Sequence, residues 1–338
     1  MVYFVCGSWL IEAEVYITVQ AMELSLILPV KNVEEEIVGI LRFVQKQAEE
    51  LNSELIVVDM GSVDRTVLQA VRQMKEMGLH GYVIQNGNST ASAALNTGIQ
   101  KADGSYISFI FARRLYENFV PAFLETAKRT KADFVFGCTG REEARSAERR
   151  SLSSAILHHG GNQYLKSWIL RGAAIDISAV LIRRSFLLER QIEFEEACRY
   201  GYSEEFIARC LLLSDAVVQA PVVLRRNETC ELKRGKQKPA GTDIFQRVES
   251  VLRIADAVRS NCPEDAELLR LVERIRVPQA VMNAVDVLLR EGNDARSVRG
   301  CLQAFGYNRL LTADRRMDPK LRRSILLWRF SPGLYRPR

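Results

Sequence analysis

The chain has 338 residues, of which 47% are hydrophobic and 26% are charged, as is typical of a globular protein. Its formal net charge is +6, and residues 314–338, with eight Arg or Lys and two Asp, account for all of it. A body that is neutral overall argues against a nucleic-acid-binding protein, whose basic face lies on the fold itself.

Seven dispersed cysteines form no C-x-x-C pair, which predicts reduced thiols in a cytosolic compartment rather than a metal cluster. No apolar run reaches the roughly 18 residues that a membrane span needs. Residues 1–21 contain Glu12 and Glu14 and no basic start, so a secretory signal is not expected. Residues 1–22 are therefore expected to be an N-terminal extension, either without a role, with translation starting at Met22, or as an edge strand or helix.

The first third of the chain alternates between apolar runs of strand length and helical patterns. Runs that end at turn residues predict strands at 24–32, 53–59, 81–85 and 104–110. Apolar residues at helical spacing predict helices between them, at 34–51, at 66–77 and around 92–98. This alternation predicts an α/β protein with a mostly parallel, doubly wound sheet flanked by helices.

Asp59 stands at the end of the second predicted strand. The run Leu55–Val58 is continuously apolar, as in a parallel strand buried on both faces, and Gly61 opens a turn after it. Open α/β sheets bind ligands at the carboxyl ends of such strands. Asp59 is therefore a candidate ligand-binding carboxylate, and the alternative is that it only caps the following helix.

Four motifs occur in the order and spacing typical of the family 2 glycosyltransferases, which have the GT-A fold. They are Pro29-Val30-Lys31-Asn32, Asp59-Met60-Gly61-Ser62-Val63-Asp64, Ala94-Leu95-Asn96-Thr97-Gly98 and Gly104 to Arg113. The chain resembles this family over residues 24–115, and more weakly to about residue 230. The resemblance implies a GT-A domain at 23–226 that binds a nucleotide sugar, with Asp59 on the base, expected to be uracil. It also implies that Pro29, Val30, Lys31, Asn32 and Asn96 line the nucleotide pocket.

The fourth motif departs from the family where a metal is usually held. The family's Asp-x-Asp carboxylates hold Mg²⁺ or Mn²⁺ at the donor diphosphate. Phe111 and Arg113 take these positions here, and neither side chain ligates a hard cation, so we expect the usual metal site to be lost. Either Arg113, together with Arg114, meets the diphosphate directly, or the site has decayed and both arginines lie in a solvated loop.

Three further departures bear on activity. Lys31 replaces an aromatic residue of the family, Met60 replaces the second Asp of its D-D-G motif, and Leu95 replaces its Arg. Lys31 adds a cation beside the phosphates, which favours a metal-free site. Met60 and Leu95 favour a site that has lost its activity.

The pattern continues with a helix at 117–131 and strands at 133–137, 179–184 and 215–225. Residues 140–151 are rich in Arg and Glu and are expected to be exposed, as a lid or as a plain solvated loop. The adjacent His158 and His159 would point apart on a helix or a strand, so no metal site is expected there.

Residues Gly201 to Arg209 resemble the family's G-E-D-x-x-F-x-x-R helix start. The resemblance implies that Glu205, with Glu204 beside it, is the general base of an inverting transfer. The structural alternative is that Ser203 is an N-cap and that both acids stabilise the first turn of a helix.

The C-terminal part is predicted to be helical. Residues 227–241 are polar and basic and indicate a linker, and residues 242–338 a helical region, with Pro278 separating two of its helices. In the tail, 318–338, apolar residues alternate with arginines: Leu321, Ile325, Leu326, Trp328 and Phe330. Such a tail suits an anionic membrane surface, and the alternative is a terminal helix packed on its own domain.

These observations favour an inverting glycosyltransferase, metal-independent if Arg113 meets the diphosphate, that moves a sugar from a UDP-linked donor to a cell-surface glycan or lipid-linked acceptor. It would work in the cytoplasm, at the inner face of the membrane. The second hypothesis is a catalytically inactive binding or partner subunit of a polysaccharide assembly. A third is a nucleotidyltransferase of the same fold, although the chain lacks its Gly-rich turn after the first strand.

Overall fold

The computed structural model describes residues 21–139, 158–171, 175–228 and 241–337. Within these ranges nine strands form one mixed sheet in the order β3-β2-β1-β4-β8-β6-β9-β5, and β7 pairs with β9. The strands are β1 Leu24–Val30, β2 Ser53–Asp59, β3 Gly81–Gln85, β4 Tyr106–Phe109, β5 Tyr116–Glu117, β6 Phe134–Thr139, β7 His158–His159, β8 Val180–Arg183 and β9 Val217–Arg226. β1, β2, β3 and β4 run parallel, whereas β8 is antiparallel to β4 and β6. The predicted α/β class is confirmed.

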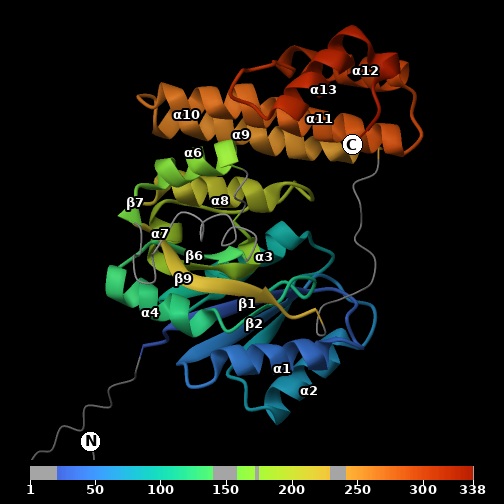
Figure 1. Cartoon of the computed structure of the whole chain (residues 1–338). Coiled ribbons are helices and arrows are strands. Elements are labelled where there is room, and N and C mark those ends of the chain that lie inside the picture. Colours follow the sequence, from blue (N-terminus) through green and yellow to red (C-terminus); the bar gives the residue numbers. More distant parts are fainter. Residues whose placement is uncertain (1–20, 140–157, 172–174, 229–240, 338) are drawn as a thin grey trace, which may run out of the picture.

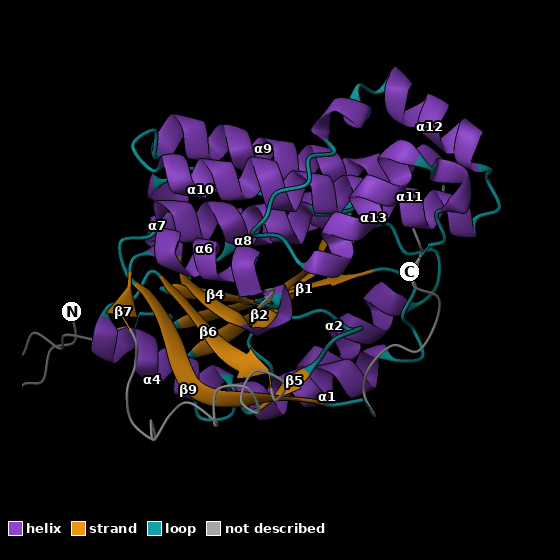
Figure 2. Cartoon of the chain, turned by 45° about the horizontal axis from the view of Figure 1, so that its top comes forward, coloured by secondary structure: helices purple, strands orange, loops and turns teal. Residues whose placement is uncertain are grey.

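Helices cover both faces of the sheet, as Figures 1 and 2 show. One layer contains α1 Ile37–Ala48, α2 Thr66–Glu76 and α4 Val120–Thr130. The opposite layer contains α3 Ala91–Lys101, α6 Gly161–Arg171, α7 Arg184–Glu189 and α8 Tyr202–Leu213. Among the described helices, none has the combination of length and apolar character that a membrane span needs.

The alternation of side chains along the strands explains this layering. In β1, Leu26 and Leu28 pack with α1 and α4 residues, whereas Ile27 packs on the other face with residues of α3 and α8. β2 repeats the pattern, with Val57 on the first face and Ile56 on the second. Because both faces are buried, the strands read as the continuous apolar runs seen in the sequence.

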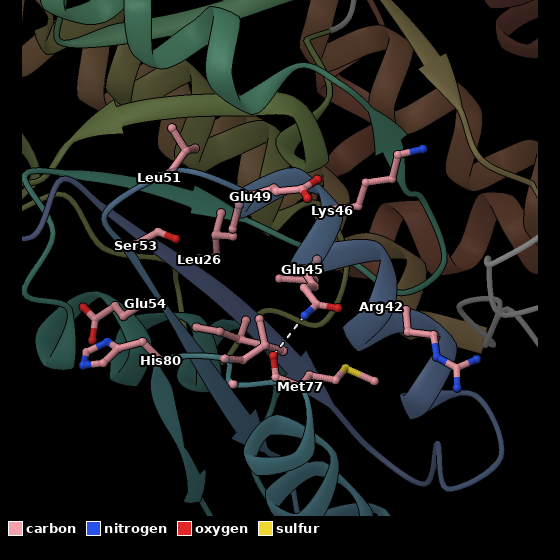
Figure 3. Close-up of a pocket in the computed structure, with 15 residues that line it drawn as sticks. Leu26, Arg42, Gln45, Lys46, Glu49, Leu51, Ser53, Glu54, Met77 and His80 are labelled. Carbon is pink, nitrogen blue, oxygen red and sulfur yellow. Dashed lines mark hydrogen bonds between the residues drawn. The ribbon is translucent and has the colours of Figure 1, made fainter.

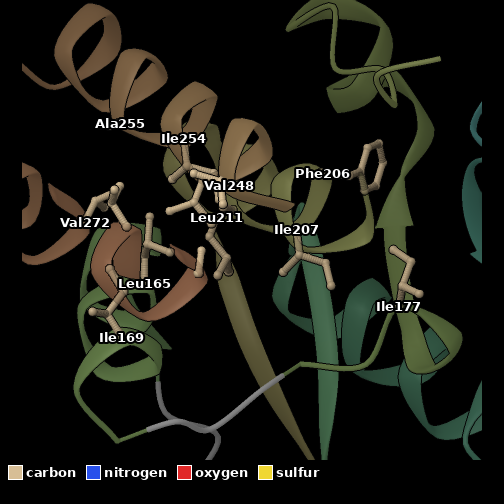
Figure 4. Close-up of a cluster of buried hydrophobic side chains, with 14 of the residues drawn as sticks. Leu165, Ile169, Ile177, Phe206, Ile207, Leu211, Val248, Ile254, Ala255 and Val272 are labelled. Carbon is tan, nitrogen blue, oxygen red and sulfur yellow. The ribbon is translucent and has the colours of Figure 1, made fainter. Parts of the chain in front are cut away.

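A helical region packs on the α6/α8 layer. It contains the 3₁₀ turn η2 Gly241–Phe245 and the helices α9 Gln246–Asn261, α10 Ala266–Leu271, α11 Val277–Arg290, α12 Ala295–Ala304 and α13 Pro319–Phe330. Leu165 and Leu211 of the α6/α8 layer belong to the same apolar cluster as Val248, Ile254 and Val272 of this region (Figure 4). The predicted C-terminal helical appendage is therefore present and shares a core with the sheet.

Pro278 does not interrupt the helical region. It lies in the first turn of α11, as predicted, but α10 runs into α11 through a π-helical turn, η3 Val272–Arg276. Proline removes one backbone N–H donor, and a π turn relaxes the hydrogen-bond pattern just before it.

The tail helix α13 packs against its own domain. Leu321, Ile325 and Trp328 are buried. The ring centroids of Trp328 and Tyr335 lie 5.6 Å apart, and the Tyr335 hydroxyl donates to Asp286 of α11 at 2.6 Å. Phe330 is 77% exposed. Three of the five apolar tail residues singled out in the sequence thus face the protein.

Several expectations lie outside the described residues. Residues 140–151, nearly all of the N-terminal extension and most of the 227–241 linker are among them.

Candidate functional site

Three loops meet at the carboxyl ends of β1, β2 and β3. Met60 N–H donates to the carbonyl of Val30 at 2.9 Å. Asn32 N–H donates to Ser62 Oγ, and Val63 N–H donates to Asn32 Oδ1, both at 2.9 Å. Asn32 takes a left-handed conformation, with φ of 51°, to make this exchange.

The third loop closes the group. Lys31 Nζ donates to Asn88 Oδ1 at 2.7 Å, so an exposed ammonium bridges the loops after β1 and β3. Gly61 has φ of 80°, and a Cβ there would lie 2.9 Å from the carbonyl oxygen of Gly87. Only glycine permits both this backbone conformation and this close approach.

Asp59 organises the turn after β2. It is 3% exposed, and its carboxylate accepts hydrogen bonds from the Gly61 N–H at 3.1 Å and the Ser62 N–H at 3.2 Å. It does not cap α2, which begins seven residues later at Thr66. Asp64 serves that helix start instead, accepting from Thr66 N–H at 3.0 Å. Burial acts to raise the pKa of Asp64, but hydrogen bonds from Thr66 and Glu34 outweigh it and lower the pKa.

Pro29 and Val30 lie inside β1 and are buried, so they position the loop rather than offer it side chains. Lys31, Asn32 and Asp59 are the candidates that the structure brings together at this edge.

Arg113 and Arg114 follow β4, which lies beside β1 in the sheet. Both are exposed, and a tight turn closes between Phe111 and Arg114, whose N–H donates to the Phe111 carbonyl at 2.8 Å. Arg114 is ion-paired with Asp176 at 2.7 Å, and the Tyr116 hydroxyl donates to the same Asp176 oxygen at 2.7 Å. Arg114 is thus engaged within the protein. Arg113 precedes it in the same loop, at the carboxyl edge of the sheet next to β1.

The β4 loop does not fit a divalent cation. Its side chains are aromatic, aliphatic and cationic, and the nearby Asp176 carboxylate is already shared by Arg114 and Tyr116. Among the described residues, no cluster of three His, Cys, Asp or Glu side chains could hold a metal ion. This loop therefore offers no carboxylate that could bind Mg²⁺ or Mn²⁺.

Asn96 serves a structural contact. Its amide donates to the Phe194 carbonyl at 2.9 Å and to Glu196 Oε1 at 3.1 Å, and its oxygen accepts from Phe194 N–H at 2.8 Å. It holds the segment before α8 onto α3, and the structure does not bring it to the three loops.

Helix α8 starts at Gly201, with φ of 92°, rather than at the predicted cap Ser203. Its N-terminal part packs against the end of β4, where the ring centroids of Phe206 and Phe109 lie 5.8 Å apart. Glu204 and Glu205 both lie in the first turn of α8.

Glu205 is 4% exposed and faces the helical region. Its two oxygens accept hydrogen bonds from Arg253 of α9: Nε donates at 2.9 and 3.0 Å, and Nη2 at 2.8 Å. Burial acts to lower the pKa of Arg253, but the hydrogen bond and charge of Glu205 outweigh it and raise the pKa. This bidentate contact occupies the lone pairs that a general base would use.

Glu204 pairs with Arg276 of η3 and lines a cavity of about 370 Å³ between α8, α9 and α11. No local sequence signal indicates the roles of Arg253 and Arg276, because both lie far from Glu204 and Glu205 along the chain, in helices with ordinary charged residues.

A second cavity, of about 500 Å³, lies at the opposite edge of the sheet, near the starts of β2 and β3 (Figure 3). Its lining mixes charges, with Arg42 and Lys46 from α1 beside Glu49 and His80. It shares no residue with the three loops.

Comparisons with known proteins agree with this geometry. The family described as Glycosyl transferase family 2 matches residues 25–190. S. aureus TarS 1–349 in complex with UDP superposes with a TM-score of 0.65 at 17% identity, covering 92% of this chain and 88% of that chain. Its complex with UDP-GlcNAc gives 0.62 at 15% identity, with the same coverage. No curated protein sequence matches the chain.

A third structure, the mannosyltransferase PcManGT from Pyrobaculum calidifontis in complex with GDP-Man and Mn²⁺, has a TM-score of 0.50 at 17% identity. It covers 92% of this chain and 85% of that chain. The family match places residues 25–190 in glycosyl transferase family 2, and the sheet order and the superpositions show that the chain has the GT-A fold.

Proposed function

We propose that the protein transfers a hexosyl group from a UDP-sugar to a hydroxyl of a cell-surface glycan or lipid-linked acceptor, with inversion and without a metal. The observation that carries this proposal is the meeting of Lys31, Asn32 and Asp59 in three interlocked loops at the carboxyl edge. The similar TarS structures were solved with UDP and UDP-GlcNAc, which supports a uridine nucleotide.

The cations near this edge suit a diphosphate. Lys31 bridges two of the loops, and Arg113 lies in the loop after the neighbouring strand β4. A guanidinium group matches phosphate oxygens with paired N–H donors and takes over the neutralising role that a divalent ion has elsewhere. Arg113 is therefore the proposed partner of the departing UDP.

The chemistry is a single displacement. The acceptor oxygen attacks the anomeric carbon, the bond from that carbon to the diphosphate oxygen breaks, and UDP leaves with the electron pair. The acceptor proton passes to a carboxylate. Of the two candidates, Glu204 lines a cavity and is paired with Arg276 through one oxygen, Oε1, whereas both oxygens of Glu205 are held by Arg253. We assign the base to Glu204 and a positioning role to Glu205.

Membrane contact, if the acceptor is lipid-linked, would use the exposed end of the tail. Phe330 is 77% and Leu334 70% exposed, and Arg329 lies next to them. Apolar side chains beside cations favour an anionic bilayer surface, and we propose these residues, not the buried Trp328, as the contact.

An inactive binding subunit is the second candidate. It is favoured by the Glu205–Arg253 pair and by the structural use of Asn96. A thermal-shift panel of UDP-, GDP- and dTDP-sugars, followed by a hydrolysis and transfer assay, separates the two. Stabilisation by one UDP-sugar together with turnover supports the transferase; stabilisation without turnover with any acceptor supports the binding subunit. Asp59→Asn should abolish the shift, and absence of any shift in the wild-type protein contradicts both.

A further inference from the structure

The cavity beside Glu204 is basic. Arg199 from the loop before α8, Arg247 from α9 and Arg276 from η3 all line it. Glu204 is the one carboxylate among the lining residues, so the lining carries a net charge of +2. A volume of about 370 Å³ admits a sugar-sized group.

The side chains of Arg199 and Arg247 have guanidinium N–H groups that can donate to a ligand, whereas Arg276 is already engaged. Arg276 is paired with Glu204 and also donates to Gln279 at 2.7 Å. Arg199 and Arg247 are exposed, and neither forms an ion pair with another residue in the described ranges. Two guanidinium groups around one hollow match the paired oxygens of a phosphate or a carboxylate.

The walls of this cavity are fixed against each other. Arg199 N–H donates to Gln246 Oε1 of α9 at 2.8 Å. A Cβ at Gly201 would lie 2.7 Å from Ser250 Oγ and 3.2 Å from Arg247 Cα, so the start of α8 rests directly on α9. The arginines are thus held at a rigid junction rather than on a loose surface.

The segment before α8 is also hydrogen-bonded to the start of α3, next to the three loops that are proposed to bind the nucleotide. Thr90 Oγ1 donates to the Glu196 carbonyl and Ser92 Oγ to the Cys198 carbonyl, both at 3.0 Å. Thr90 is the N-cap of α3, which follows directly on the loop containing Asn88. The segment that carries Arg199 therefore packs on the helix that begins at the donor edge.

We propose that this cavity binds an oxyanion of the acceptor, so that the substrate class is a glycan carrying phosphate or carboxylate groups. The idea rests on the proposed function, because it seats the acceptor beside Glu204. Arg199 and Arg247 bind the anionic group of the acceptor. A neighbouring hydroxyl of the same acceptor then lies next to the Glu204 carboxylate. A neutral acceptor would leave both guanidinium groups unused.

The test measures binding of glucose 6-phosphate, glucuronate and glucose to the full chain by NMR or calorimetry, without any donor. Wild-type protein should bind at least one of the two anionic sugars and not glucose. Arg199→Gln/Arg247→Gln should weaken that binding at least about tenfold, since each lost charged hydrogen bond contributes substantially. The matched control is Arg296→Gln/Arg299→Gln, which removes the same charge from exposed positions on α12.

Three results overturn the proposal: binding that survives in Arg199→Gln/Arg247→Gln, binding that is lost equally in the control variant, or equal binding of glucose and glucose 6-phosphate. So does absence of binding of either anionic sugar. A preference between the phosphate and carboxylate probes supports it and selects the anion. UDP stabilisation, measured in parallel, shows that the variants are folded. It also reports separately on the donor site, so the proposed function can fail while the anion site stands.

Discussion

The Glu205 carboxylate and the Arg253 guanidinium join the sheet domain to the helical region through three hydrogen bonds of 2.8, 2.9 and 3.0 Å. The Glu205 side chain is 5% exposed and that of Arg253 33%. A pair of this kind fixes the first turn of α8, and with it Glu204, relative to α9. The geometry at the candidate base thus depends on the helical region.

Removing Arg253 should destabilise the protein, because it leaves the Glu205 carboxylate buried without its partner. Arg253→Met is expected to lower the free energy of unfolding by about 2–3 kcal/mol, below the full range for buried pairs because Arg253 is partly solvated. Urea unfolding measures this, and Arg253→Met/Glu205→Met should regain part of the loss. Arg259→Met, which breaks a more exposed ion pair on the same helix, is the control and should change stability by less than about 1 kcal/mol. Equal losses in both variants would show that the buried pair has no special role.

Substitutions of Glu204 and Glu205 should have different effects on kcat. Glu204→Gln is expected to lower kcat by about 10² to 10⁴, because it removes the proposed proton acceptor. Glu205→Gln should lower Tm and leave kcat of the folded protein within about tenfold, because its role is positioning. The measurement is kcat and KM at a temperature where both variants are folded. A full loss of kcat in Glu205→Gln at unchanged Tm, with Glu204→Gln active, would reverse the assignment.

Tyr307 should make stability fall at alkaline pH. Burial, together with the Glu249 charge, raises its pKa to about 12, whereas the unfolded chain titrates near 10. The neutral phenol is thus favoured in the folded state, so its contribution is complete below pH ~10 and is lost as pH rises through about 12. Ultraviolet titration of Tyr307→Phe should lack one late-titrating phenol, and its unfolding free energy should depend less on pH. An unchanged titration curve would contradict this environment.

In the tail, Trp328 should contribute to stability, whereas Phe330 and Leu334 should contribute to membrane binding. Trp328→Ala removes a side chain that is 2% exposed and is expected to lower stability by about 3–5 kcal/mol. Phe330→Ser/Leu334→Ser should leave Tm unchanged but reduce flotation with anionic liposomes. Wild-type protein that never floats, or a double variant that floats as well, would rule out the proposed contact.

The fold could be predicted well because its signals are local. The runs at β1 and β2 are continuous and apolar, and the turns after them carry glycine and asparagine, so strand type and order followed directly. The helix at 34–51 was likewise recognisable by periodicity; it begins later, at Ile37, because the three glutamates form a preceding turn.

The site was less predictable because its decisive contacts span long sequence distances. Nothing near Glu205 reveals that Arg253 takes both its oxygens, and nothing near Asn96 reveals its bonds to Phe194. The same holds for the tail, where Trp328 has the sequence character of a membrane anchor but is buried against Tyr335. Local patterns specify which side chains are available, whereas tertiary packing decides which remain available to a ligand.

The most direct test of the account is calorimetric binding of UDP-hexose to wild-type protein and to Arg113→Met, each with Mn²⁺ and with EDTA. We predict a wild-type Kd that EDTA changes by less than about twofold and a loss of about tenfold or more in Arg113→Met, the effect of losing hydrogen bonds to a charged group. Binding that requires Mn²⁺, or that is indifferent to Arg113, would contradict the claim that cationic side chains receive the diphosphate.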